Sequence, residues 1–295
     1  MTITDHNRTR IGVAYALAAF FAWGLNPFYF KAVANIPTLE ILGHRVVWSM
    51  LFLLPLILYA RQFPQVIRAL TGRRTFITLA ATSIIVGINW LLYIHTVEVG
   101  RVLESSLGYY INPLVNVMFG RVFLGERLSR PQIVAAILAA AGVLNLVIAY
   151  GEVPWLALGL AVTFAIYGLL RKVVAVDALP GLFIETVMLF PFAVVGLALF
   201  GHDFSASDIK ADLLLILAGP VTFLPLLWFT CAARRLKLSV LGFFQFISPS
   251  IQFLLAVFVF GEHFGHAHYV TFALIWIAIL IFTMAPRLMR EPAVT

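Results

Sequence analysis

Two stretches of this sequence, 136 positions apart, determine the fold that we expect. Residues 107–128 read LGYYINPLVNVMFGRVFLGERL, and residues 243–264 read FFQFISPSIQFLLAVFVFGEHF. Each stretch carries a proline within an apolar run and a Gly-Glu pair that follows the proline by twelve residues. Chance agreement between apolar segments is the alternative, but a shared offset for three features favours an internal duplication. The same offset also pairs Pro55 with Pro191 and Arg101 with Lys237.

The composition predicts a membrane protein. Of the 295 residues, 62% are hydrophobic and only 11% are charged, whereas soluble domains carry about 25% charged residues. A soluble globule cannot bury that much apolar surface, so we expect a lipid environment. Backbone polar groups in lipid must be hydrogen-bonded within their own segment, and apolar runs of about 20 residues are therefore expected to be helices. The predicted spans are 11–33, 38–60, 75–97, 102–124, 131–150, 154–172, 181–200, 211–231, 238–260 and 268–286.

The basic residues predict an orientation. Most of the 20 lysines and arginines lie at connections that share one side of the membrane if the chain has ten spans. The opposite connections hold acidic residues such as Glu152 and Asp203. The positive-inside rule then places both termini in the cytoplasm. A net charge of +7 is also typical of nucleic-acid binding, but these charges lie in short clusters between apolar runs, so we expect no nucleic-acid partner.

The repeat and the span count together predict the architecture. Residues 1–150 form a first unit of five spans, and residues 151–295 form a second. Because each unit has an odd number of spans, the second unit is inverted relative to the first. The expected fold is an all-α polytopic membrane protein with ten transmembrane helices in two inverted five-helix repeats. Inverted repeats are a common transporter design, since two similar halves can rock about a shared interface.

Four segments resemble a known family. They are AFFAWGLNPFYFK at 19–31, LEILGHRVVWS at 39–49, NWLLYIHTVEVGRVLESSLGYYINPLVNVMFG at 89–120 and GFFQFISPSIQFLLAVFVFGE at 242–262. Together they resemble the RarD branch of the drug/metabolite transporter superfamily, EamA type, and the resemblance covers nearly the whole chain. It implies a bacterial inner-membrane permease with a central cavity between the two halves, which exports small metabolites or drug-like compounds.

Ionisable residues within the predicted spans are functional candidates, because a charge in lipid is costly. Arg45 lies about two helical turns inside the second span. Two interpretations have equal weight: Arg45 binds a carboxylate of the substrate, or it forms a structural ion pair with Glu40 or Glu104. Because histidine titrates near neutral pH, the candidates for proton coupling are Glu40, His44, His95 and Glu104.

Polar and aromatic residues in the spans predict the wall of the cavity. Proline at Asn26-Pro27 removes a helical hydrogen bond, so this pair marks either a plain kink, which is slightly favoured, or a discontinuous helix that lines the substrate site. The fourth span carries a polar stripe that serves either as substrate contacts or as interhelical hydrogen bonds. Aromatic walls with a few polar groups suit a flat or cationic small molecule. The predicted substrate-binding residues are Trp23, Asn26, Tyr29, His44, Arg45, Trp48, Asn89, Tyr93, Ser105, Tyr109, Asn112, Tyr167, Gln245 and Gln252.

The inverted repeat favours a transporter, and two other classes stay open. An intramembrane enzyme is one alternative, and a channel or sensor of the same topology is the other. We expect no cofactor and no metal site, because the histidines near residue 265 offer too few defined ligands. Glu126 and Glu262 are expected to be structural. The expected partners are a small-molecule substrate and the lipid bilayer, proton coupling is open, and so is the oligomeric state.

Overall fold

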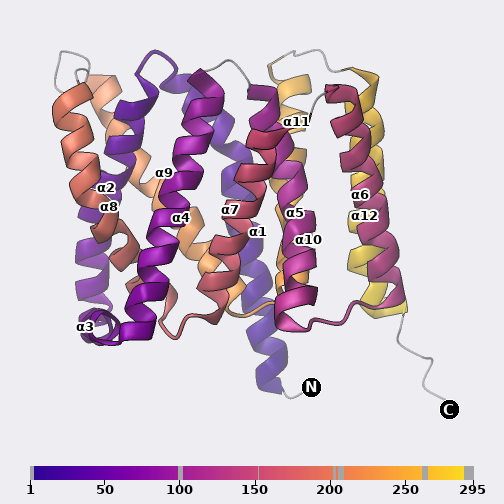
Figure 1. Cartoon of the computed structure of the whole chain (residues 1–295), viewed down its shortest axis with the longest axis horizontal. Helices are drawn as coiled ribbons and strands as arrows, with labels where there is room; N and C mark the ends of the chain where they lie inside the picture. The colour runs from indigo at the N-terminus through magenta and orange to yellow at the C-terminus, as the bar shows by residue number, and fades with distance from the viewer. Residues whose placement is uncertain are drawn as a thin grey trace.

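The computed structural model describes residues 3–98, 102–151, 153–201, 204, 209–260 and 265–288. In this part of the chain every regular element is a helix, and the helices lie side by side as one slab (Figure 1). The chain therefore has the all-α polytopic fold that its composition predicts. The helices are α1 (Ile3–Ala32), α2 (Thr38–Tyr59), α3 (Phe63–Thr71), α4 (Arg73–Glu98), α5 (Val102–Leu124), α6 (Arg130–Tyr150), α7 (Trp155–Val173), α8 (Ala178–Phe200), α9 (Ile209–Ala233), α10 (Leu238–Gln245), α11 (Ile247–Phe258) and α12 (His266–Leu288).

The long helices coincide with the predicted spans, although the count of ten is not confirmed. Among the described residues, nine helical segments are long and apolar enough to cross a membrane, with α10 and α11 counted as one segment. The span predicted at 102–124 coincides with α5, but α5 is not among those nine. The chain is nevertheless a multi-pass membrane protein.

One short helix was not predicted. α3 occupies what the apolar runs indicate as a connection, and it lies at the end of the slab from which α1 begins (Figure 1). Pro64 stands in its first turn, where the missing N–H of proline costs no hydrogen bond. Val66 and Ala69 are buried on one side of this helix. α3 therefore attaches the connection to the bundle by a short apolar face.

A proline separates the helix pair α10 and α11. α10 ends at Gln245 and α11 begins at Ile247. Proline at position 249 has no N–H to donate to the carbonyl of Gln245, four residues earlier. The ninth predicted span is thus two helices joined at Phe246, and the joint lies beside the cavity described below.

Of the two interpretations of Asn26-Pro27, the discontinuous helix is not found, because α1 continues from Ile3 to Ala32 through this pair. Pro27 leaves the carbonyl of Trp23 without its helical donor. The side chain of Gln252 on α11 supplies the missing bond, since its Nε2 donates to the Trp23 carbonyl at 3.0 Å. A polar side chain from the other half of the chain thus stabilises an uninterrupted helix.

The two halves of the chain are closely intermingled. The main helix pairs are α1 with α9, α2 with α8 and α9, α5 with α7 and α10, and α6 with α12. Each pair joins a helix before residue 151 to a helix after it. Small residues permit the close approach: a Cβ added at Gly219 of α9 would lie 2.7 Å from the Cβ of Trp48 on α2. A Cβ added at Gly242 of α10 would lie 2.7 Å from the carbonyl oxygen of Pro113 on α5.

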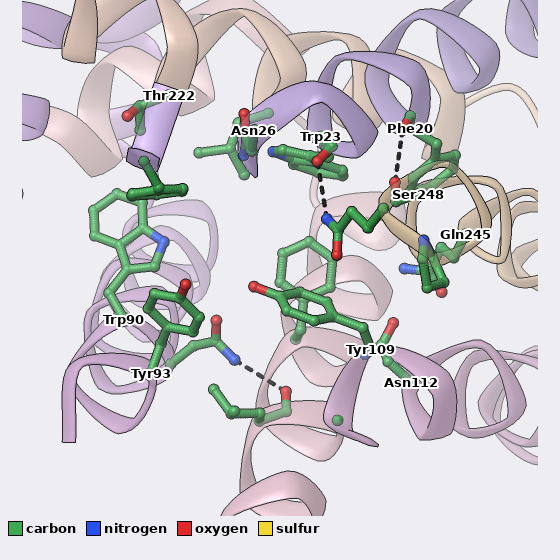
Figure 2. A pocket seen from close by; sticks show the side chains of 18 of the residues that line it. Phe20, Trp23, Asn26, Trp90, Tyr93, Tyr109, Asn112, Thr222, Gln245 and Ser248 are labelled. Atoms are coloured by element: carbon green, nitrogen blue, oxygen red, sulfur yellow. Dashed lines mark hydrogen bonds between the residues drawn. The ribbon is translucent and has the colours of Figure 1, made fainter. Parts of the chain in front are cut away.

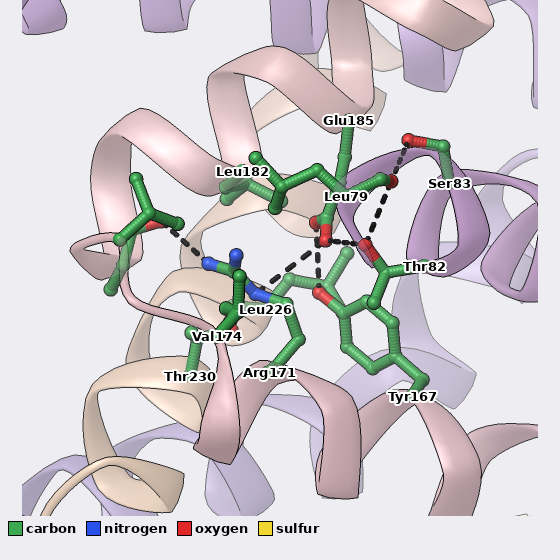
Figure 3. A network of polar contacts seen from close by, with 12 residues as sticks. Leu79, Thr82, Ser83, Tyr167, Arg171, Val174, Leu182, Glu185, Leu226 and Thr230 are labelled. Carbon is green, nitrogen blue, oxygen red and sulfur yellow. Dashed lines mark hydrogen bonds and ion pairs between the residues drawn. The ribbon is translucent and has the colours of Figure 1, made fainter. Parts of the chain in front are cut away.

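A buried ion pair lies where α4, α7 and α8 meet (Figure 3). Arg171 of α7 and Glu185 of α8 are almost inaccessible to solvent, and 3.5 Å separates Nε of the arginine from Oε1 of the glutamate. The carboxylate also accepts hydrogen bonds from Thr82, at 2.5 Å, and from the hydroxyl of Tyr167, at 3.2 Å. Arg171 in turn donates to the carbonyl of Ala178. The carboxylate is therefore compensated by a cation and two hydrogen bonds.

Glu126 lies at the start of α10, in agreement with its expected structural role. Its Oε1 accepts from the backbone N–H of Leu238 at 2.6 Å. Its Oε2 accepts from the backbone N–H of Ser239 at 2.9 Å and from the Ser239 hydroxyl at 2.6 Å. A carboxylate is favourable there because helix N-termini have unpaired N–H groups and a positive dipole end. Glu262, its counterpart in the repeat, lies outside the described residues.

Candidate functional site

A cavity of about 130 Å³ lies between the two halves of the chain (Figure 2). Helices α1, α2, α4 and α5 contribute its wall from the first half, and α7, α9, α10 and α11 contribute from the second. The wall includes nine of the fourteen predicted substrate-binding residues. These nine are Trp23, Asn26, Arg45, Asn89, Tyr93, Tyr109, Asn112, Gln245 and Gln252.

Two of the other predicted binding residues, His44 and Trp48, lie on a different face of α2. The indole Nε1 of Trp48 donates to Nδ1 of His44 at 3.2 Å. Both rings pack against Phe204, with centroid distances of 4.9 Å for His44 and 6.0 Å for Trp48. The structure therefore places this pair outside the cavity wall, and they do not enter the site that we propose.

Tyr29 and Tyr167 are also buried away from the cavity wall. The hydroxyl of Tyr29 donates to the carbonyl of Leu214 on α9 at 3.1 Å. The hydroxyl of Tyr167 belongs to the Glu185 network of Figure 3. Each of the two hydroxyls therefore forms a hydrogen bond that joins two helices. Ser105 is the last of the fourteen, and its side chain lies outside the described part of the chain.

The predicted proton-coupling residues are dispersed. Glu40 and His44 lie 3.9 Å apart on adjacent turns of α2, as the i, i+4 spacing predicts, and both are buried. His95 is exposed near the end of α4 and does not line the cavity. The side chain of Glu104 is outside the described residues. Proton coupling through these residues stays a prediction.

Arg45 is the charged side chain of the cavity wall. Its Nε donates to Oγ1 of Thr222 on α9 at 2.8 Å. Its guanidinium carbon lies 5.3 Å from the ring centroid of Trp90 and 5.9 Å from that of Phe30, which are cation–π distances. Among the described residues no carboxylate lies within ion-pair distance of Arg45, and Glu40 contacts His44 instead. The structural ion pair with Glu40 is therefore not formed.

The amides on the wall also hold the helices together. Asn112 of α5 donates to the carbonyl of Ala161 on α7 at 2.6 Å. Asn116, one turn further along, donates to the side chain of Gln245 on α10 at 2.6 Å. Asn89 of α4 donates to the carbonyl of Leu160 at 2.9 Å. The interhelical role that the sequence leaves open for these amides is therefore present, alongside their position on the wall.

Three polar side chains on the wall have no such bond. The hydroxyls of Tyr93 and Tyr109 and the amide of Asn26 form no hydrogen bond with any described residue. Figure 2 shows the hydroxyls of Tyr93 and Tyr109 directed into the space between α4 and α5. These groups retain their hydrogen-bonding capacity for a solute.

Ten residues of the wall are not among the predicted binding residues. Most are apolar, and an apolar residue in a span gives no signal that separates a cavity wall from packing. Thr222 and Ser248 are polar residues beside helix prolines, and that combination could have indicated them. The ten residues are Phe20, Phe30, Trp90, Gly108, Leu160, Phe164, Thr222, Leu226, Ser248 and Pro249.

Comparison with known proteins identifies the family. Residues 10–148 match the model of the EamA-like transporter family. A protein of Salmonella typhimurium called Protein RarD is 49% identical over 286 residues, which cover 95% of this chain and 97% of that protein. Protein RarD of Escherichia coli is 47% identical over 284 residues, with 95% and 96% covered. The chain belongs to the EamA-like transporter family, in its RarD branch.

Two further comparisons concern the class and the fold of this chain. An uncharacterized transporter of Bacillus subtilis, YojE, is 42% identical to this chain over 286 residues, which cover 95% of this chain and 96% of that protein. A solved crystal structure superposes with a TM-score of 0.73 at 17% identity, covering 97% of this chain and 100% of that one. This structural likeness shows the fold alone. The family and the relatives' names identify a membrane transporter in general.

Proposed function

We propose that this chain is a secondary transporter that exports small metabolites or drug-like molecules across the bacterial inner membrane. The solute binds in the cavity between the two halves. Inward-open and outward-open states alternate as one half moves against the other. Both termini lie in the cytoplasm, and residues 1–150 and 151–295 act as the two inverted units.

The cavity is the observation that carries this proposal. It is about 130 Å³ in volume, and both halves contribute to its wall. Transporters with internal repeats bind their solute at such an interface, near the middle of the membrane. Because the wall combines aromatic rings with a few polar groups whose hydrogen bonds are unused, it has the composition of a small-molecule site.

The clustering of basic residues supports the proposed orientation. In Figure 1 the beginning of α1 lies at the same end of the slab as α3, next to the connections 61–62 and 72. This end contains Arg61, Arg68, Arg73 and Arg74. Basic connections face the cytoplasm in the positive-inside pattern.

A counterflow experiment tests the proposal. The purified protein is reconstituted in liposomes that are loaded with a small-molecule extract of bacterial cells, and mass spectrometry identifies solutes that leave. We expect a few solutes to leave at a saturable rate, with competition between them. Liposomes without protein and liposomes with heat-denatured protein are the controls.

The same experiment separates the alternative classes. Flux that rises in proportion to concentration without saturation would favour a channel. Conversion of a solute to a new product would favour an intramembrane enzyme. Solute release indistinguishable from protein-free liposomes would contradict the proposed function. Levels of the identified solute inside and outside cells with and without the protein then test the outward direction.

A further inference from the structure

The charge of the cavity wall has one sign. Among the side chains that line the cavity in the described part of the chain, Arg45 is the charged one, and no aspartate or glutamate accompanies it. A cation with no carboxylate partner is costly inside a membrane. The aromatic faces of Trp90 and Phe30 compensate this charge in part. An anionic solute would compensate the rest.

The guanidinium of Arg45 is oriented by a hydrogen bond that leaves most of its donors unused. Its Nε donates to Thr222 at 2.8 Å. The two terminal nitrogens form no hydrogen bond with any described residue. Together these nitrogens can donate to both oxygens of a carboxylate or a sulfonate.

The other groups with free hydrogen-bonding capacity on the wall can also donate. The hydroxyls of Tyr93 and Tyr109 and the amide of Asn26 can each donate to an acidic group of a solute. Among the described residues no carboxylate lines the cavity, and the acceptors on the wall are neutral, such as the amide oxygens of Asn89 and Gln252. The positive charge of Arg45, with no carboxylate beside it among the described residues, therefore favours a negatively charged solute over a cation, and the neutral groups can donate to that solute.

Aromatic rings line the side of the cavity that lies opposite Arg45. Figure 2 shows Thr222 and Trp90 on one side and Trp23 and Phe20 on the other. The ring of Trp23 contacts that of Phe164 edge to face, with 5.8 Å between centroids. Arg45 lies with Thr222 and Trp90, so its charge is on the side of the cavity opposite Trp23 and Phe20. Such a wall suits a solute with an acidic group at one end and an aromatic ring at the other.

The volume limits the size of the solute. The cavity measures about 130 Å³, whereas an engineered apolar cavity of about 150 Å³ binds benzene. The two volumes are similar, so in the state that the structure describes the cavity limits the solute to about one aromatic ring.

We propose that the solute class of this transporter is small organic anions built on a single aromatic ring. The acidic group binds Arg45, and the ring lies against Trp23 and Phe164. This inference rests on the proposed function and adds the chemical class of the solute. It keeps the flat shape that the sequence indicates and replaces the cationic charge by a negative one.

Binding of three matched probes to the purified protein tests this class. The probes are benzenesulfonate, benzenesulfonamide and phenyltrimethylammonium, which share one ring but carry a fixed negative charge, no charge and a fixed positive charge. Binding is measured by titration calorimetry, with quenching of tryptophan fluorescence as a second signal, because Trp23 and Trp90 line the cavity. We expect benzenesulfonate to bind at least tenfold more tightly than benzenesulfonamide, and phenyltrimethylammonium to bind more weakly than either. Methanesulfonate, which lacks the ring, should bind at least tenfold more weakly than benzenesulfonate.

Two variants assign the preference to Arg45. Arg45→Gln should remove the preference for benzenesulfonate and change the affinity for benzenesulfonamide by less than threefold. Lys31→Gln is the matched control, because it also removes a positive charge from a helix of the first half. Lys31 lies over the ring of Phe260 and does not line the cavity. The preference should persist in this control variant.

The inference and the proposed function can fail separately. Equal or tighter binding of phenyltrimethylammonium, or a tenfold anion preference that persists in Arg45→Gln, would overturn the anion class. Absence of binding by all three probes from a protein that is active in extract counterflow would overturn it as well, while the transporter function stands. Selective benzenesulfonate binding without any extract counterflow would instead contradict the proposed function and leave the anion site in place.

Discussion

Arg45 of α2 and Arg171 of α7 both lie within long apolar helices, and their surroundings are opposite. Arg171 is fully buried, 3.5 Å from the carboxylate of Glu185, and donates to a backbone carbonyl (Figure 3). Arg45 lines a cavity, donates to Thr222 and lacks a carboxylate partner among the described residues. An ionisable residue within a span is therefore not informative by itself. The partner decides whether its charge is used within the fold or is available to a solute.

The largest expected effect concerns the paired arginine. Arg171→Met should lower the free energy of unfolding by about 3–5 kcal/mol, because Glu185 would remain buried without a cation. Thermal unfolding in detergent measures this loss. The double variant Arg171→Met, Glu185→Leu should recover most of the stability, since neither charge remains. If the single variant unfolded at the wild-type temperature, the ion pair of Arg171 would not contribute to stability, and the contrast with Arg45 would be lost.

The second prediction concerns the unpaired arginine. Arg45→Met should reduce benzenesulfonate uptake by proteoliposomes at least about tenfold, because hydrogen bonds to a charged group contribute about 1.5–3 kcal/mol. Its free energy of unfolding should stay within about 1 kcal/mol of the wild type, since a single described hydrogen bond is lost. A large loss of stability with a proportional loss of flux would make Arg45 structural, as Arg171 is.

Two tyrosines, Tyr167 beside Arg171 and Tyr93 on the cavity wall, allow the same comparison with smaller expected effects. Tyr167→Phe should cost about 1 kcal/mol of stability, because its hydroxyl donates to Glu185. Tyr93→Phe should leave stability unchanged, since the Tyr93 hydroxyl forms no hydrogen bond with a described residue, but it should weaken benzenesulfonate binding. Unfolding and titration of both variants give the comparison. The reverse result would place the Tyr167 hydroxyl, not that of Tyr93, at the solute.

The smallest expected effect concerns the residue that orients Arg45. Thr222→Val removes the acceptor at 2.8 Å from Nε, and benzenesulfonate affinity should fall about threefold, as expected for one modest hydrogen bond. Thr230→Val is the control, because the Thr230 hydroxyl donates to the carbonyl of Leu226 and Thr230 does not line the cavity. Equal effects of the two substitutions in a titration would show that orientation of Arg45 is unimportant.

Much of the fold could be predicted from the sequence, because lipid restricts the choices. Long apolar runs must be helices in a bilayer, and every long helix of the structure coincides with a predicted run. The proline signals were harder to interpret. Pro249 separates two helices, but Pro27 does not, because Gln252 compensates the carbonyl that Pro27 leaves free. That compensation comes from a residue 225 positions away in the sequence, which local pattern cannot reveal.

The candidate site could be predicted in part. Helical spacing identified polar stripes, and residues such as Asn89 and Tyr93 do line the cavity. The same spacing could not separate Arg45 from His44, which is adjacent in the sequence but packs against Trp48 and Phe204. Adjacent residues on a helix point about 100° apart, so one can face a cavity while its neighbour faces another helix.

The amino-acid sequence by itself determined the membrane environment, the helical class and the position of almost every helix, because these follow from composition and run length in a solvent that cannot bond the backbone. Only the tertiary structure decided which intramembrane charge has a carboxylate partner. That choice depends on side chains from distant helices, Glu185 for Arg171 and Thr222 for Arg45. An ion pair forms only when two side chains on different helices come within a few ångströms of each other. The spacing of residues along one helix does not predict that distance.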